Sequence, residues 1–144
     1  MAKPFKFLPD IAIADVAFEA YGKTLNELFE AAAQAVFETM VETSSVKPRQ
    51  TQEISLNAST IEYLLYDFLS EIVFLKDTKS MVFAKVTVVL QEHNHIFTLR
   101  ATLQGDTIDP ETQKLGNDVK AITLHLFSIR KKGNIYIARV VVDI

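Results

Sequence analysis

The chain has 144 residues, 49% of them hydrophobic and 23% charged, which suits one compact domain. It contains no cysteine, so disulfides, thiolate nucleophiles and cysteine-ligated zinc are excluded. Because 18 acidic residues outnumber 15 lysines and arginines, the surface has no overall positive field to hold a nucleic-acid backbone. We expect a single domain over residues 1–144 that does not bind nucleic acid strongly.

The sequence predicts neither secretion nor a membrane span. MAKPFKF lacks the charged and apolar blocks of a signal peptide, and no window approaches 18 consecutive apolar residues. We therefore expect a cytoplasmic protein without a membrane partner.

The first predicted elements are a strand and a helix. Residues 11–21, IAIADVAFEAY, form an apolar and aromatic run that predicts a buried strand. Thr24 and Glu27 then have the spacing of a capping box. Apolar residues recur at three- and four-residue steps from there to about Val41, which predicts an amphipathic helix.

A second strand and helix follow. Gln52–Leu56 predicts a short strand, and Ser59 with Glu62 forms a second capping-box pattern. Apolar residues at helical spacing over 61–73 predict a second one-sided helix.

The rest of the chain predicts four strands rich in β-branched and aromatic residues, over 81–90, 96–105, 119–130 and 135–144. Short polar turns at 92–94 and 131–134 predict two antiparallel hairpins, joined by a long polar connection over 105–118. The expected fold class is α+β, with two amphipathic helices packed on a mainly antiparallel sheet.

Signatures of catalysis are missing. Four glycines do not supply a phosphate-binding loop, and no GxSxG, HExxH or Cys/His pair is present, so we name no catalytic residue and expect a protein that is not an enzyme. His93 and His95 have a spacing that suits a metal, but a solvated hairpin tip explains them better. His125 is expected to be half-buried and hydrogen-bonded.

Three charged residues, Asp15, Lys120 and Asp143, interrupt apolar strands, where a charge is costly unless it is paired or reaches water. A symmetric turn centred on residues 132–133 predicts that Asp143 lies opposite Ile122, with Lys120 diagonally across on the same face. The terminal carboxylate of Ile144 would add an anionic group beside Asp143.

Several interpretations of these charges remain open. They suit ordinary solvated positions, like Lys85, Arg100 and Arg139 on the other strands. They equally suit a Lys120–Asp143 salt bridge, a site for Ca²⁺ or Mg²⁺, or a contact with a phosphate-bearing partner.

Four colinear segments resemble one family. ADVAFEAYGKTLNELFEAAAQAVFETM, LLYDFLSEIVFLKDT, DVKAITLH and the terminal VVVDI together resemble archease, a small protein that activates the RtcB-type RNA ligase in tRNA splicing and RNA repair. The resemblance implies an accessory, chaperone-like protein that promotes guanylylation and turnover of the ligase. It also implies two helices against β-sheet structure and an acidic metal-binding site.

The resemblance assigns site residues by position. It implies metal ligation by Asp15, Asp118 and Asp143, which the terminal carboxylate of Ile144 adjoins, and a functional role for Lys120. The expected ion is a divalent cation, Ca²⁺ or Mg²⁺/Mn²⁺. The family's histidine and threonine before Asp15 are here Ala12 and Ile13, and a histidine of the long connection is here Gln113, so three polar positions differ.

The leading hypothesis is therefore a non-enzymatic activator of an RtcB-type RNA ligase, acting through an acidic, metal-capable corner. One alternative is a small metal-dependent hydrolase that uses the same carboxylates to position water. Another is a divergent archease-like fold without metal, serving as a binding or chaperone-like module.

Overall fold

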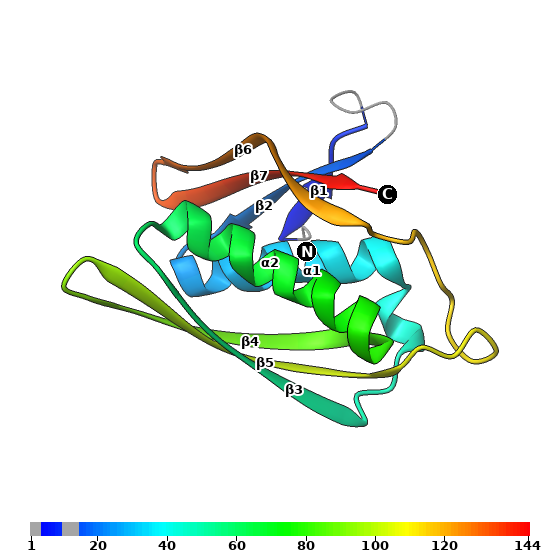
Figure 1. The fold of residues 1–144 in the computed structure, drawn as a ribbon. Helices are drawn as coiled ribbons and strands as arrows, with labels where there is room; N and C mark the ends of the chain where they lie inside the picture. Colours follow the sequence, from blue (N-terminus) through cyan, green and yellow to red (C-terminus); the bar gives the residue numbers. More distant parts are fainter. Residues whose placement is uncertain (1–3, 10–14) are drawn as a thin grey trace.

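The computed structural model describes residues 4–9 and 15–144, and in this part of the chain two helices lie between two antiparallel sheets (Figure 1). The elements in chain order are β1 (Phe5–Phe7), β2 (Val16–Gly22), α1 (Leu25–Met40), a 3₁₀ turn (Thr43–Ser45), β3 (Gln50–Ala58), α2 (Ile61–Lys79), β4 (Met81–His93), β5 (Ile96–Thr107), β6 (Ala121–Lys132) and β7 (Ile135–Asp143). No helix in the described part is long and apolar enough to cross a membrane.

The two sheets have the strand orders β1-β2-β7-β6 and β3-β5-β4. α1 packs between β2 and β4, and α2 packs between β6 and β3 (Figure 1). The predicted α+β class is confirmed. The strands form two sheets with the helices between them, whereas the sequence pattern suggested one sheet covered on one side.

The composition of α1 explains why a helix can lie between two sheets. Ten of its 16 residues are buried, and they include the consecutive run Ala31–Ala33 and the run Ala35–Phe37. Consecutive residues point to different sides of a helix, so burial of such runs requires partners on more than one face. Alanine side chains are small enough to let both sheets approach closely.

Aromatic rings join the layers into a single core. Phe29 of α1 stacks on Phe68 of α2 with ring centroids 6.1 Å apart. Phe37 of α1 contacts Phe83 of β4 at 5.6 Å. These four side chains and Phe18 of β2 are fully buried, so a single hydrophobic cluster connects both helices with both sheets.

The two predicted hairpins are present, with turns slightly displaced from the predicted positions. β4 continues to His93, and Asn94 and His95, both with positive φ, form the two-residue turn into β5. Gly133, with φ +61°, begins the turn between Lys132 and Ile135. A left-handed conformation is accessible to glycine and tolerated by asparagine, which places both turns at these residues.

The N-terminal region differs from its prediction. β2 begins at Val16, and residues 11–14 of the strand predicted over 11–21 lie outside the described residues. The short strand β1 was not predicted, because three residues carry too little periodicity to be recognised. It pairs Phe5 with Ala20 and Phe7 with Phe18 at the edge of the first sheet.

Candidate functional site

The candidate site is the corner of the first sheet where β2 begins and β7 ends. β2 and β7 are antiparallel, with Val16 opposite Val142. Extending this register by one residue sets Asp15 across from Asp143, at the spacing of neighbouring strands. Both residues are half-buried, so their carboxylates remain accessible to water.

The side of the sheet follows from the alternation of strand side chains. Phe18 and Ala20 are fully buried and belong to the strand that packs on α1, so even-numbered positions of β2 face the helices. Asp15 and its partner Asp143 therefore belong to the outer face, which points away from the helices. The sequence prediction that these two acids meet at one corner agrees with this register.

The prediction that Lys120 and Asp143 share one face of the sheet is wrong. The hairpin turn is centred on residues 133–134, one residue later than predicted, and β6 contains a bulge between Thr123 and Ser128 that shifts its pairing with β7 again. Both displacements together set Asp143 opposite Ala121 rather than Ile122. A bulge inserts unpaired residues into one strand, and a symmetric turn cannot reveal it. The Lys120 main-chain N–H donates to the Asp143 carbonyl oxygen at 2.8 Å. Its side chain instead lines a groove beside α2.

The Asp118 carboxylate forms an ion pair with Lys76 of α2. The Lys76 ammonium group donates to the Asp118 carboxylate at 2.5 Å, to Asp77 at 2.7 Å and to the Val119 carbonyl oxygen at 2.7 Å. The hydrogen bond from Lys76 lowers the pKa of Asp118. Burial lowers the pKa of Lys76, but its hydrogen bonds to Asp118 and Asp77 outweigh burial and raise it. The ion pairs of the described residues do not include a Lys120–Asp143 salt bridge.

The donor chemistry of the corner fits a hard cation, but the number of converging side chains is small. Carboxylate oxygens are the ligands that Ca²⁺ and Mg²⁺ prefer. Over residues 4–9 and 15–144, however, no three His, Asp or Glu side chains converge as a metal site. The first ligands would be Asp15, Asp143 and the terminal carboxylate of Ile144. Asp118 could join them only after its ion pair with Lys76 is broken. Metal binding remains a prediction.

The positions where the chain departs from the family pattern have different outcomes. Ala12 and Ile13 lie outside the described residues. Gln113 is buried and holds the long connection together: its amide donates to the Thr107 carbonyl oxygen at 2.9 Å and accepts from the Asp109 N–H at 2.9 Å. Gln113 therefore stabilises the loop that leads to Asp118.

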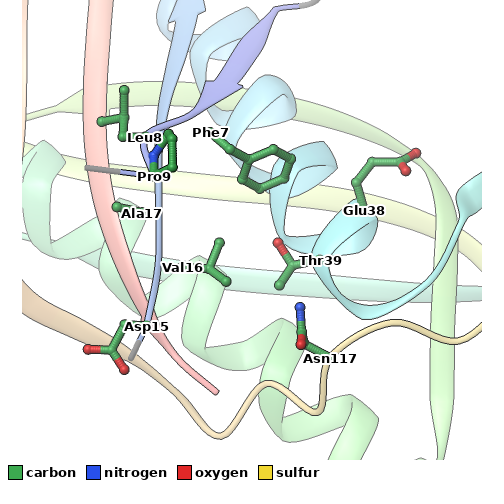
Figure 2. Close-up of a pocket in the computed structure, with 9 residues that line it drawn as sticks. All are labelled: Phe7, Leu8, Pro9, Asp15, Val16, Ala17, Glu38, Thr39 and Asn117. Atoms are coloured by element: carbon green, nitrogen blue, oxygen red, sulfur yellow. The ribbon is translucent and has the colours of Figure 1, made fainter. Parts of the chain in front are cut away.

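A hollow of about 440 Å³ adjoins the corner on the helix side. Figure 2 shows Phe7, Val16 and Thr39 around it, with Asn117 reaching in from the long connection. The Asp15 carboxylate points away from Thr39 and Asn117 in this view. Two acids line the hollow: Asp15 lies at its rim, and the Glu38 carboxylate accepts a hydrogen bond from the Thr43 hydroxyl.

A second charged cluster on the same outer face was not predicted. Glu19 of β2 is 6% exposed and accepts hydrogen bonds from Arg139 at 2.9 Å, from Arg130 at 3.2 Å and from the Tyr21 hydroxyl at 3.2 Å. Arg139 was grouped with ordinary solvated positions, whereas it is half-buried and paired. Only the register, which sets Glu19 opposite Arg139, brings these residues together.

The pKa values in this cluster follow from its hydrogen bonds. Burial alone raises the pKa of Glu19, but the hydrogen bonds from Arg139, Arg130 and Tyr21 outweigh burial and lower it. Burial, reinforced by the neighbouring Glu19 carboxylate, raises the pKa of Tyr21. Glu19 is therefore ionised at neutral pH and holds both arginines on the sheet.

The three histidines lie away from this corner. His93 and His95 are exposed at the tip of the β4–β5 hairpin, as predicted. His125 is exposed, so the prediction that it is half-buried is wrong. It lies in the bulge of β6, where Leu126 has φ +55° and the alternation of faces breaks down.

Comparison with known proteins decides the family. The model of the Archease protein family (MTH1598/TM1083) matches residues 5–144. The chain belongs to the archease family. Protein archease of Sulfurisphaera tokodaii is 40% identical over 131 residues, covering 91% of this chain and 93% of that protein. Protein archease of Methanothermobacter thermautotrophicus is 36% identical over 142 residues, covering 99% of both chains.

Solved structures agree with this membership. The solution structure of Methanobacterium thermoautotrophicum protein 1598 superposes with a TM-score of 0.88 at 35% identity, covering 99% of this chain and 100% of that one. A Thermotoga maritima crystal structure, described as an archease and possible chaperone, superposes with a TM-score of 0.63 at 19% identity, covering 92% and 93%. The second likeness concerns the fold alone. The resemblance to archease predicted from four sequence segments is confirmed.

Proposed function

We propose that this protein is a non-enzymatic activator of an RtcB-type RNA ligase, and that it acts through the corner formed by Asp15 and Asp143. The observation that carries the proposal is the β2–β7 register in a member of the archease family: it sets two acids from opposite ends of the sequence side by side. Both are half-buried at the end of a sheet, where a partner can reach them.

The charge distribution supports action on a protein rather than on RNA directly. The chain carries a net charge of -3, so a partner that already holds RNA must supply the positive surface. Asp118 and Lys120 adjoin the corner through the segment that runs from Asn117 to the start of β6. We propose that this segment positions the corner against the ligase.

The test is the guanylylation of the ligase. The RtcB-type ligase of the same organism is mixed with GTP and Mn²⁺, with and without this protein, and guanylylated ligase is followed over time. We expect at least tenfold acceleration with the unmodified protein and loss of most of that acceleration with Asp143→Ala, because the corner then keeps one side-chain carboxylate.

Glu53→Ala is the matched control, because Glu53 is an exposed acid on β3 in the other sheet. It should accelerate guanylylation as well as the unmodified protein does. Equal acceleration by the Asp143→Ala protein would contradict the proposed site. Absence of any acceleration would contradict the proposed function, and turnover of a phosphoester substrate without the ligase would favour a metal-dependent hydrolase instead.

A further inference from the structure

An apolar groove lies between α2 and the first residues of β6. It has a volume of about 230 Å³ and is lined by Tyr66, Phe74 and Asp77 from α2 and by Lys120 and Ile122 from the β6 side. α2 and β6 are in contact along this side of the molecule (Figure 1). The groove is separate from the hollow of Figure 2, with which it shares no lining residue.

Large apolar side chains are exposed on the two elements that form the groove, one of them in its lining and three outside it. Phe74 is 56% exposed and Tyr63, on the same exposed face of α2, is 57% exposed. In the neighbouring bulge of β6, Leu124 and Leu126 are 56% and 47% exposed. Exposed apolar side chains that lie close together mark contact sites, and these four lie on the two elements that border the groove.

The backbone conformation of the bulge is a second observation that favours a contact site here. Leu126 has φ +55°, a left-handed conformation that is unfavourable for a leucine. Beside it, Phe127 contacts the ring of Tyr66 edge to face at 6.1 Å. The molecule thus holds an unfavourable backbone conformation in a segment that also exposes two leucines, which is a feature found at functional surfaces.

The main chain of β6 is open at this edge, unlike that of β4. α1 covers the β4 edge with three side chains: Glu30 accepts from the Val88 N–H at 2.8 Å, Asn26 accepts from the Leu90 N–H at 3.0 Å, and Gln34 donates to the Ala84 carbonyl oxygen at 3.4 Å. In the described part of the chain, no side chain of α2 makes such a bond to β6. Among the strands that the structure describes, β6 pairs with β7 alone, so alternate main-chain groups on its other edge are free to pair.

The charge beside the groove is negative. α2 carries four acidic residues, Glu62, Asp67, Glu71 and Asp77, and two lysines. One of these lysines, Lys76, is already engaged by Asp118 and Asp77. The groove lining itself holds one acid, Asp77, and one lysine, Lys120, so the excess of acids comes from the rest of α2. A segment that enters the groove therefore meets an apolar floor with mainly acidic side chains of α2 beside it.

We propose that this groove binds a short extended segment of a partner protein, in which apolar side chains alternate with lysine or arginine. The segment adds to the free edge of β6 at Ala121–Thr123, places an apolar side chain against Phe74, and presents its cations to the acids of α2. The inference rests on the proposed function, since it names the surface by which an activator holds its partner. A second copy of this chain is a poorer occupant, because the bulge after Thr123 interrupts the regular edge that two β6 strands would need.

The first experiment uses a probe that does not depend on any ligase. A capped hexapeptide alternating lysine with phenylalanine is titrated into the protein while amide chemical shifts are followed by NMR, with a glutamate–phenylalanine hexapeptide as the charge control. We expect saturable shifts at residues 66–77 and 121–123 with the first peptide, at least tenfold slower amide exchange at 121–123, and at least tenfold weaker binding of the second. Absence of saturable shifts at these residues overturns the inference.

Phe74→Ala tests the groove, and Val89→Ala is its matched control, because Val89 is 49% exposed on β4 in the other sheet. The Phe74→Ala protein should bind the lysine–phenylalanine peptide at least tenfold more weakly, and Val89→Ala should leave binding within twofold. Equal binding by both variants overturns the inference. Unchanged melting temperatures show that both variants fold.

The ligase is then measured with the same variants. Tenfold weaker ligase binding by Phe74→Ala alone supports the groove as its docking site, and unweakened ligase binding overturns that role. Peptide binding without any ligase binding rejects the proposed function and keeps the groove as a peptide site. A dimer of this chain that Phe74→Ala dissociates, seen by analytical ultracentrifugation, overturns the inference in favour of self-association.

Discussion

Single residues on the outer face of the first sheet divide into two charged groups. Asp15 and Asp143 lie at the corner, and Glu19 lies four residues further along β2, about 13 Å away at the rise of a strand. Glu19 is neutralised by Arg130 and Arg139, whereas no ion pair joins the corner acids to a basic side chain in the described part of the chain. The corner is thus the acidic group that stays available to a ligand.

Glu19→Gln tests the buried cluster. At pH 7 we expect a loss of about 1 to 3 kcal/mol in the free energy of unfolding, because the half-buried Arg139 and the more exposed Arg130 lose their buried counter-charge. The folded-state pKa of Glu19 lies below its unfolded value, so its contribution is present above the unfolded pKa and is lost as the pH falls through the folded pKa. The difference between the two proteins should therefore shrink below about pH 4.

Urea unfolding of both proteins at pH 7, 5 and 3 measures this difference. The control is Glu53→Gln, which alters an exposed acid on β3. Its free energy of unfolding should differ from that of the unmodified protein by nearly zero at all three pH values. A difference for Glu19→Gln that stays constant down to pH 3 would show that packing, and not charge, accounts for the loss.

At the scale of elements, the start of each helix depends on one hydroxyl. Thr24 accepts from the Glu27 N–H at 3.1 Å, as the predicted capping box requires, although the Glu27 carboxylate accepts from the Lys23 N–H rather than from Thr24. In α2 the predicted cap at Ser59 is wrong. Thr60 is the cap, accepting from the Tyr63 N–H at 3.2 Å. Adjacent serine and threonine both suit a cap, so the pattern alone could not select between them.

Thr60→Ala should lower the free energy of unfolding by about 1 kcal/mol, because the first turn of α2 loses its side-chain acceptor. Ser59→Ala, one residue earlier, should change it by less than about 0.5 kcal/mol. Chemical denaturation of the two variants side by side measures both values. Equal losses, or a larger loss for Ser59→Ala, would contradict the position of the cap.

At the scale of the whole molecule, the two-sheet arrangement creates the site. Placing β7 between β2 and β6 brings the start of β2, the end of β7 and the segment before β6 to one corner. The β6–β7 hairpin by itself does not position Asp15. Asp15 reaches the corner because β2 pairs with β7. The same arrangement leaves α2 beside the open edge of β6, whereas α1 covers the edge of β4.

Metal binding is predicted at this scale, because its ligands come from opposite ends of the chain. If the corner binds Ca²⁺ or Mn²⁺, an ion concentration 100 times the dissociation constant should raise the melting temperature by roughly 5 to 10 °C. Changing Asp15 and Asp143 together to Asn should abolish the rise, and Glu53→Gln should keep it. Absence of a rise in the unmodified protein would favour an archease fold that binds partners without metal.

Much of the fold was predictable from the sequence because its causes are local. The 3.6-residue period of α1 and α2, the β-branched strands from residue 81 onward and the two hairpin turns all depend on near neighbours. The family likeness was predictable for a related reason, since it rests on segments whose order is written in the chain. Asp15 and Asp143 could be named before their positions were known, because a charge in an apolar strand is costly.

Only the tertiary structure decided which residues meet. The turn position and the bulge in β6 together set Asp143 opposite Ala121 instead of Ile122. Asp118 pairs with Lys76, and Glu19 pairs with two arginines more than a hundred residues away in the chain. Each outcome depends on the register between strands or on the packing of α2 against the long connection. A one-residue change of register moves every side chain to the opposite face, and no local pattern in the chain determines that choice.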